Sequence, residues 1–340
     1  MADTFNYRID HHGSLVRPAG LTDPGGDPTA LDDAVKEAVA LQRRVRSTVV
    51  TDGDFPWEDF RGAVLGSVSG FRRTGDTGSD GLSRWVAESP PKADGPLVAD
   101  RAARLAELTV IAPKVSLPSP AYLAATTFDP ALAGSGGPAS ARELGEALAE
   151  IIHAEIGLLV ARGVRLIQVD NPLLLGHIAA EPATAGALTF EDTLAVDALA
   201  VRLDERPEGV RIGVCPGWRA PDAVNRARAE RLYGDLPADR WILPYDQGTA
   251  AELDLLRALP EDRDACLGVV DATTPELEEI DTVLARIDAG AEIKDIEDMA
   301  LSPSRGFADV ARRPLLGAED QRRKLILVET LARYCWGNEF

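Results

Sequence analysis

The segment from residue 163 to residue 175 constrains the fold of this chain more than any other stretch. Its apolar and β-branched run, residues 164–169, predicts a strand that is buried on both faces, as parallel sheets require. The run stops at Asp170, and Pro172 cannot donate a hydrogen bond to a neighbouring strand. An acid at the carboxyl end of a buried strand indicates a functional site, although a turn or N-cap role is the alternative for Asp170.

The same pattern of a short apolar strand followed by a polar loop recurs along the chain. Strands are predicted at residues 5–12, 47–51, 109–115, 164–169, 210–214, 241–244, 266–270 and 299–301. Helices are predicted at about 31–45, 99–108, 140–159, 191–202, 222–232, 253–259, 274–287 and 318–335. This alternation predicts an α/β fold, a single (β/α)₈ TIM barrel over residues 1–340. A doubly wound sheet is the alternative, but no GxGxxG sequence follows a strand.

Two local patterns add detail to this barrel. Thr274, Pro275 and Glu276 are typical of an N-cap, a first-turn proline and a first-turn acid, so a helix is expected to begin there. Residues 62–96 are rich in Gly, Ser and Pro and longer than a simple connection, which predicts a lid-like insertion after the second strand.

Polar residues at the strand ends are expected to meet at one face of the barrel, because active sites of this fold lie at the carboxyl ends of the strands. Trp57 and Trp218 follow two of these strands and would offer a flat wall to a ring-bearing ligand, or else pack beneath helices. The predicted site face holds His12, Asp52, Asp54, Lys114, Asp170, Cys215, Tyr245, Asp246, Asp271, Ser304 and Arg305.

Charge and composition exclude several classes of partner. The net charge of -19 repels nucleic acid and anionic membranes, and no apolar run of 18 residues occurs. The three cysteines form no CxxC pair or disulfide framework, and the first residues lack a signal pattern. A cytoplasmic protein with a small-molecule substrate is expected.

Six strings stand in order along nearly the whole chain: GSLVRP at 13–18, TDGDF at 51–55, LPSP at 117–120, IQVDNP at 167–172, LSPSRGF at 301–307 and AEDQRRKL at 318–325. Together they resemble the cobalamin-independent methionine synthase family in its short, single-barrel form, within the methionine synthase/uroporphyrinogen decarboxylase-like superfamily. In that family a zinc ion in the barrel binds homocysteine as a thiolate, and methyltetrahydrofolate supplies the methyl group. The superfamily also contains the metal-free uroporphyrinogen decarboxylase.

The resemblance implies that the residues holding the amino acid end of the substrate are retained. The matching positions are Gly13 with Ser14, Asp54 in place of a glutamate, and Asp170, whereas the glutamate that would follow is Asn171.

The resemblance also implies that most zinc ligands are missing. The family's His-x-Cys corresponds to residues 213–215, which leaves Cys215 but no histidine, and the ligand glutamate falls near residues 244–245, next to Asp246. The last ligand cysteine is Arg305, whose permanent charge would repel a dication. With Cys215 as the only retained ligand position, zinc at this location is not expected.

These residues predict an enzyme of the methyl- or alkyl-transferase family that acts on a small amino or carboxylic acid without the zinc. Ser14, Asp54, Lys114, Asp170, Trp218 and Arg305 are the expected substrate-binding residues, and Asp170, Cys215, Asp246 and Arg305 are the expected catalytic residues. Methyltetrahydrofolate is a candidate donor.

Three alternatives remain open at this point. A zinc-free lyase or decarboxylase would use Arg305 and Lys114 to hold a carboxylate. A non-catalytic small-molecule binding protein is a further alternative. A relocated metal site would use His11 or His12 with Asp170, Cys215 and Asp246.

Overall fold

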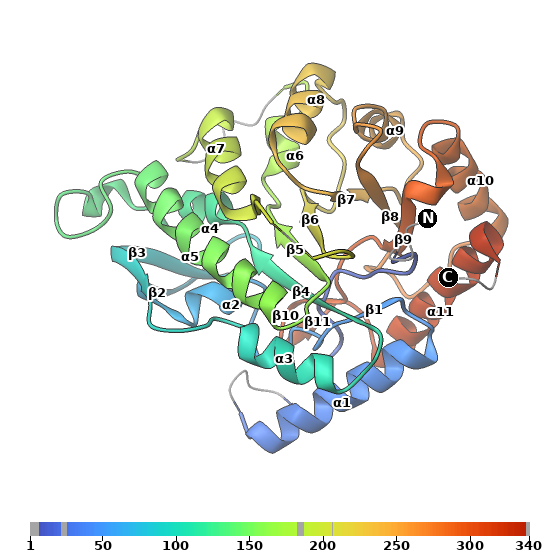
Figure 1. Cartoon of the computed structure of the whole chain (residues 1–340), viewed down its shortest axis with the longest axis horizontal. Helices are drawn as coiled ribbons and strands as arrows, with labels where there is room; N and C mark the ends of the chain where they lie inside the picture. Colours follow the sequence, from blue (N-terminus) through green and yellow to red (C-terminus); the bar gives the residue numbers. More distant parts are fainter. Residues whose placement is uncertain (1–6, 22–25, 182–186, 206, 338–340) are drawn as a thin grey trace.

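The centre of the molecule is a parallel, curled sheet of seven strands in the order β1-β4-β5-β6-β7-β8-β9. The computed structural model describes residues 7–21, 26–181, 187–205 and 207–337. The strands lie inside a surrounding layer of helices (Figure 1). Their bounds are β1 Val49–Val50, β4 Ala112–Pro118, β5 Leu166–Asp170, β6 Arg211–Cys215, β7 Arg240–Pro244, β8 Asp264–Val270 and β9 Met299–Pro303.

The segment around Ile9 hydrogen-bonds to both edges of this sheet. Ile9 forms a parallel bridge with Leu301 in β9, where the Asp10 N–H donates to the Leu301 carbonyl at 2.9 Å. On the other side, the N–H of Thr48, next to β1, donates to the Ile9 carbonyl at 3.1 Å. The sequence predicts the first strand in this segment, and the part of that strand before Tyr7 lies outside the described residues.

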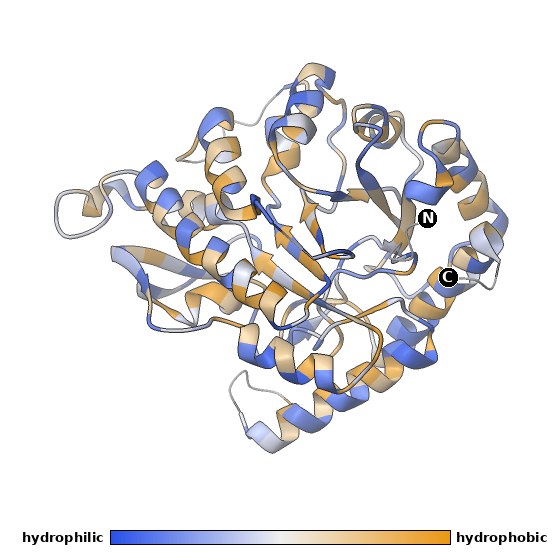
Figure 2. Cartoon of the chain, viewed as in Figure 1, coloured by the Kyte–Doolittle hydropathy of each residue, from blue (hydrophilic) through white to orange (hydrophobic). Residues whose placement is uncertain are grey.

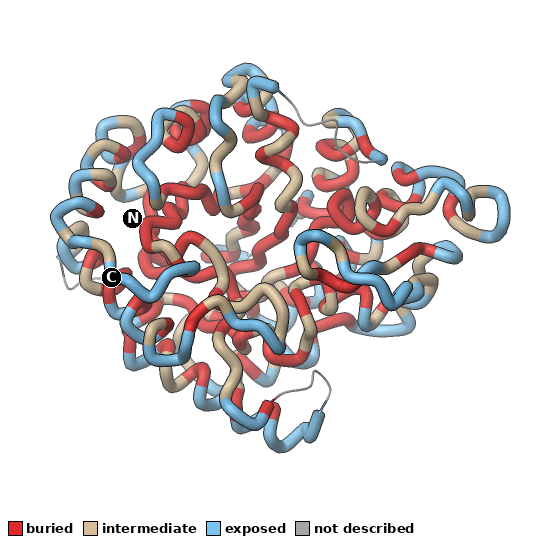
Figure 3. The backbone as a smooth tube through the Cα atoms, turned by 180° about the vertical axis from the view of Figure 1, so that it is seen from behind, coloured by how far each residue is buried: buried red, intermediate tan, exposed pale blue. Residues whose placement is uncertain are grey.

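The helices turn their apolar faces toward the sheet and their polar faces outward (Figure 2), and the most deeply buried backbone lies at the centre (Figure 3). None of the helices within the described residues has the length and hydropathy needed to cross a membrane. The helices are α1 Pro28–Arg44, α2 Gly62–Leu65, α3 Ala99–Glu107, α4 Pro120–Thr127, α5 Ala141–Ala161, α6 Leu174–His177, α7 Phe190–Val201, α8 Arg226–Asp235, α9 Ala250–Arg257, α10 Ile280–Ala291 and α11 Ala318–Trp336. Short 3₁₀ turns occur at Pro130–Leu132 and Ile296–Asp298.

The expected start of the helix at Thr274 is wrong. Helix α10 begins at Ile280, after the N-cap residue Glu279. The hydroxyl of Thr274 donates instead to Asp271 at 3.3 Å, and Asp271 also accepts from the backbone N–H of Thr273 at 2.7 Å. Because Asp271 holds these two threonines in a turn, the helix cannot begin until that turn is complete.

Residues 62–96 contain ordered secondary structure. After α2, strands β2 Val68–Thr77 and β3 Ser83–Ala93 form an antiparallel hairpin, with Val68 opposite Ala93. Strand β3 contacts α4 and α5 at the edge of the molecule (Figure 1). After β9, strands β10 Ala308–Val310 and β11 Arg313–Pro314 form a second, shorter hairpin.

A buried carboxylate fixes the start of α3. The side chain of Glu155, on α5, accepts hydrogen bonds from the backbone N–H groups of Leu97, Val98 and Ala99 at 2.7–2.8 Å. The first N–H groups of a helix have no partner within the helix, and this carboxylate supplies one from a neighbouring helix.

Replacing Glu155 with Ala is expected to lower the free energy of unfolding by about 2–3 kcal/mol, because three buried N–H groups lose a charged acceptor. Urea denaturation followed by circular dichroism measures this change. The control is Glu150→Ala, an exposed position on the same helix, where a change within about 0.5 kcal/mol is expected. Equal effects at both positions would contradict the capping role.

Candidate functional site

A cavity of about 320 Å³ opens at the carboxyl ends of the strands. Residues from the segments after Ile9, β1, β6 and β9 contribute to it, together with Asp170 at the end of β5, and the turn between β2 and β3 adds Asp80 and Leu82. The lining residues are His12, Ser14, Leu15, Arg17, Gly53, Asp54, Trp57, Glu58, Asp59, Phe60, Asp80, Leu82, Asp170, Trp218, Arg305, Gly306, Ala308, Asp309 and Ala311.

Among the carboxyl groups that line this cavity, Asp54 comes from the loop after β1 and Asp170 from the end of β5. Asp170 ends β5, is 6% exposed, and accepts a hydrogen bond from Gln168 Nε2 at 2.7 Å. Burial raises the pKa of Asp170 to about 7. Burial, followed by the negative charges of Asp52 and Asp170, raises the pKa of Asp54 well above its usual range. A cation that entered the cavity would therefore be attracted by both groups and would favour their ionised forms.

The loop after β1 holds Asp54 in place by an unusual backbone. Asp54 has a φ of +56°, and its N–H donates to the Asp52 side chain at 3.0 Å. The Arg17 guanidinium donates to the carbonyl groups of Phe55 and Trp57 and fixes the outer part of this loop. A Cβ atom at Gly13 would lie 2.9 Å from Asp54 Oδ2, so the GS sequence gives the carboxyl group the space that it occupies.

Arg305 and Trp218, two of the predicted site residues, stack on each other. The Arg305 guanidinium carbon lies 4.6 Å from the centre of the Trp218 ring, and the guanidinium forms an ion pair with Asp309. The Arg305 side chain remains 22% exposed. The Phe307 N–H donates to the Ser14 carbonyl at 2.9 Å, so the loop after β9 is joined to the loop after Ile9.

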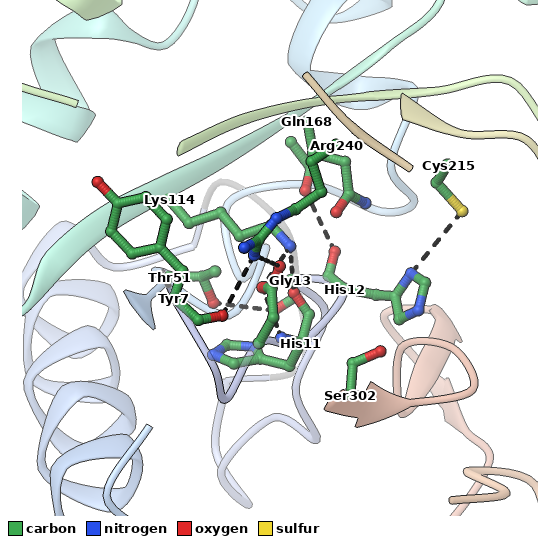
Figure 4. Close-up of polar contacts among 12 residues, drawn as sticks. Tyr7, His11, His12, Gly13, Thr51, Lys114, Gln168, Cys215, Arg240 and Ser302 are labelled. Carbon is green, nitrogen blue, oxygen red and sulfur yellow. Dashed lines mark hydrogen bonds and ion pairs between the residues drawn. The ribbon is translucent and has the colours of Figure 1, made fainter. Parts of the chain in front are cut away.

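His12 and Cys215 lie next to each other beneath the cavity (Figure 4). His12 Nδ1 is 3.9 Å from Cys215 Sγ, and His12 lines the cavity while Cys215 does not. Burial, with the positive charges of Lys114 and Arg305, lowers the pKa of His12 to about 3. Burial and the nearby Asp170 raise the pKa of Cys215 well above its usual range. At neutral pH the pair is therefore an uncharged imidazole and a protonated thiol.

The other two predicted site residues, Lys114 and Asp246, are not among the residues that line this cavity. Lys114 Nζ donates to Asp10 Oδ1 and to the His11 carbonyl, both at 2.6 Å, deep inside the sheet (Figure 4). Asp246 accepts from the Gln247 side chain at 3.0 Å. Lys114 is therefore held by buried groups, whereas Asp246 is bound to its exposed neighbour Gln247.

Three further predicted site-face residues also have local partners. Tyr245 donates its hydroxyl to the Arg286 carbonyl, Asp271 accepts from Thr273, and the hydroxyl of Ser304 accepts from the N–H of Ala272.

The residues at the family's zinc-ligand positions do not fit a zinc ion. Within the described ranges, no group of three or more His, Cys, Asp or Glu side chains could hold a metal ion. Gly213 has no donor, Arg305 is a cation paired with Asp309, and the Cys215 thiol favours its protonated form. A tetrahedral zinc site needs three or four such ligands. Asn171 donates to Asp197 on α7 at 2.8 Å, within the helical layer.

Sequence reasoning missed several lining residues. Asp309 lies four residues after Arg305 and forms an ion pair with it. This spacing brings two side chains together only where the backbone turns, and the sequence does not show that turn. Asp80 lies in the turn of the β2–β3 hairpin, where the composition predicts only an irregular insertion. Arg17 belongs to the GSLVRP string, so the resemblance to the family could have pointed to this residue.

Comparisons with solved structures identify the fold. A protein from Listeria monocytogenes, described as a candidate vitamin-B12-independent methionine synthase, has a TM-score of 0.74 at 23% identity and covers 98% of both chains. A B12-independent methionine synthase from Shewanella, solved in complex with selenomethionine, has a TM-score of 0.77 at 18% identity and covers 97% of both chains. This chain has the cobalamin-independent methionine synthase-like fold. A methyltransferase from Methanosarcina mazei is more distant, with a TM-score of 0.53 at 13% identity over 98% of this chain and 96% of that one.

The curated relatives carry no described function. The uncharacterized proteins YxjH and YxjG of Bacillus subtilis are 26% and 24% identical, each over 97% of this chain and 95% of their own length. No family model matches the chain. The TIM-barrel prediction agrees with the fold of these structures, and the methionine synthase-like resemblance is confirmed.

Proposed function

We propose that this protein is an enzyme of the methyl- or alkyl-transfer type that binds a small amino or carboxylic acid without a zinc ion. The observation that carries the proposal is that one cavity is lined by two buried carboxyl groups, Asp54 and Asp170, and by the guanidinium of Arg305. The methionine synthase-like fold supports the reaction class, and the selenomethionine bound to the Shewanella protein supports an amino acid ligand.

The charges of the cavity suit a zwitterion. An ammonium group near Asp54 and Asp170 would stabilise carboxylates that burial otherwise keeps protonated. A carboxylate near Arg305 would compete with Asp309 for the planar guanidinium, which binds carboxylates in a bidentate manner. The volume of about 320 Å³ is enough for a ligand of this size.

Proton transfer would fall to Asp170 in this proposal. Its pKa of about 7 is close to the optimum for a general base at neutral pH. Methyl transfer would break the bond between the methyl carbon and a nitrogen of a methyltetrahydrofolate-class donor and form a bond from that carbon to the acceptor atom. Asp170 would take the proton that the acceptor loses, and a proton taken up by the donor nitrogen would complete the exchange. Trp57 and Trp218 line the cavity and offer apolar faces to a ring.

A metal-free lyase or decarboxylase is the second candidate. The same raised pKa leaves part of the Asp170 population protonated at neutral pH, and a carboxylic acid can deliver a proton to a carbanion. Arg305 would then hold the carboxylate. Release of CO₂ without a methylated product would favour this candidate.

We also infer that the chain is one closed (β/α)₈ barrel, with Arg8–Asp10 as the eighth strand, and that the β2–β3 hairpin acts as a lid. The hydrogen bonds of Ile9 to both sheet edges support the first inference. The position of Asp80 and Leu82 in the cavity wall supports the second.

Binding of a panel of amino acids and simple carboxylic acids, measured by calorimetry, tests the proposal. The affinity for the ligand that binds best is expected to fall by about 10-fold or more in Arg305→Gln, because a hydrogen bond from a charged group is lost. Arg219→Gln is the matched control, since Arg219 is an exposed neighbour of Trp218 that does not line the cavity. Mass spectrometry after incubation with methyltetrahydrofolate then detects transfer. Ligand affinity unchanged in the Arg305 variant would contradict the binding mode.

A further inference from the structure

The ring of His12 has one nitrogen with a partner and one without. Nδ1 lies 3.9 Å from Cys215 Sγ, whereas Nε2 is buried and has no hydrogen-bond partner among the described residues. His12 is 7% exposed and lines the cavity. Buried polar atoms are nearly always paired in folded proteins, so an unpaired nitrogen at a cavity wall indicates a place for a ligand atom.

The Cys215 thiol determines which of the two nitrogens carries the proton. The sulfur has two acceptors within reach, His12 Nδ1 at 3.9 Å and the Gly217 carbonyl at 4.0 Å. If the thiol donated to Gly217, the His12 Nδ1–H would donate to sulfur, which is a weak acceptor. If the thiol donates to Nδ1, the ring proton lies on Nε2 and an N–H group points at the cavity. The Gly217 carbonyl and Nδ1 are both good acceptors for the thiol, and an acidic ligand in the cavity would favour the arrangement that offers it an N–H group.

The charges that face His12 suit a donor of this kind. Lys114 and Arg305 are positive and Asp10 is negative, while His11 is a second buried imidazole beside it. Lys114 and Asp10 bond to each other at 2.6 Å. Arg305 acts electrostatically on His12 and lines the cavity with it, as does Arg17, whose guanidinium is already bound to the carbonyl groups of Phe55 and Trp57. Two neighbouring donors, one of them charged, are typical of a site for an oxyanion.

We propose that His12 Nε2–H and the Arg305 guanidinium together bind one oxyanionic group of the ligand, and that Cys215 is a positioning residue that fixes the tautomer of His12. The proposal rests on the proposed function in one respect, that the ligand is an acid. It deepens that function by assigning the carboxylate of the ligand to His12 and Arg305, next to the pair Asp54 and Asp170 that would hold the ammonium group. It also gives Cys215 a role in place of base catalysis, in agreement with its absence from the cavity wall.

Nuclear magnetic resonance of protein labelled with ¹⁵N-histidine tests the tautomer directly. The chain has four histidines, and the His12→Gln spectrum identifies the signals of His12. The expected result at pH 7 is a neutral ring protonated on Nε2. Cys215→Ser, which keeps a donor, should preserve this tautomer, and Cys215→Ala should increase the fraction protonated on Nδ1. A ring protonated on Nδ1 in the unmodified protein would overturn the proposal.

Titration with formate tests the subsite. Formate is expected to shift the Nε2 signal of His12, and Arg305→Gln should weaken this binding by about 10-fold or more. His12→Gln, whose amide reaches about as far as Nε2, should bind formate more tightly than His12→Leu does. Formate that leaves the His12 signal unchanged would overturn the proposal. A parallel titration with zinc would also overturn it if zinc shifted the His12 signal in the unmodified protein but not in Cys215→Ala.

These outcomes separate the subsite from the proposed function. If formate shifts the His12 signal but no amino acid or other carboxylic acid is converted, the subsite stands and the proposed function fails. If an amino acid is converted without any change at His12, the proposed function stands and the subsite fails.

Discussion

Replacing Lys114 with Met is expected to lower the free energy of unfolding by about 3–5 kcal/mol. The Lys114 ammonium and the Asp10 carboxylate are 1% and 0% exposed and lie 2.6 Å apart. Within the described part of the chain, Asp10 would then rely on its longer ion pair with Arg240, at 3.4 Å. A buried charge that loses its main partner cannot recover the hydration that folding removed.

Denaturant unfolding at constant pH measures the effect of Lys114→Met. Lys36→Met is the matched control, because the Lys36 ion pair with Asp33 is exposed, and a change within about 0.5 kcal/mol is expected there. The double variant Asp10→Asn with Lys114→Met removes both charges and should recover part of the loss. A variant that keeps full stability but loses ligand binding would instead support the sequence-based prediction that Lys114 binds substrate.

Replacing Asp170 with Asn is expected to abolish binding of amino acids, whose ammonium group would lie next to this carboxylate. The same change is expected to make the ligand-free protein more stable at pH 8. The pKa of Asp170 is about 7 in the folded protein and about 3.9 in an unfolded chain. A carboxyl group with a raised folded-state pKa binds more protons when folded, so its contribution to stability falls as pH rises from about 4 to 7. Above pH 7 the free-energy cost of holding the ionised Asp170 carboxylate in a buried position is fully present, and the neutral amide of asparagine removes this cost.

The size and pH dependence of the Asp170→Asn effect can be measured by thermal unfolding between pH 4 and pH 8. A gain of about 1–3 kcal/mol is expected at pH 8, and little difference is expected near pH 4, where the native carboxyl group is already protonated. The exposed Asp222→Asn change should have no such dependence. Ligand affinity of the unmodified protein should increase as pH rises through 7, because the ammonium group binds the ionised form. Affinity that falls over this interval would contradict the binding mode.

Much of the architecture could be predicted because parallel strands have a clear sequence signal. The run that ends at Asp170 is buried on both faces, as its composition indicates. Since all parallel strands deliver their ends to one face, the sequence alone is enough to group Ser14, Asp54, Trp218 and Arg305, and these residues do share one cavity.

The features that sequence reasoning missed depend on partners far apart in the chain. The N-terminus of α3 is capped by Glu155 from another helix, and the charge of Lys114 is neutralised by Asp10. A strand pattern shows which face a lysine occupies but not which group it meets. The β2–β3 hairpin was missed because its strands are largely polar and exposed, so the alternation that reveals a half-buried strand is absent.

The junction of Ser14 with Phe307 joins segments from opposite ends of the chain at the cavity wall. A nascent chain therefore has no complete pocket until β9 has been synthesised and paired with the segment at Ile9. A fragment that stops before residue 299 would not respond to ligand, however well its helices had formed. In the finished protein, a ligand that binds the folded state alone would slow the separation of the first and last segments. Ligand-dependent protection of both segments from hydrogen exchange would then report that the barrel is intact.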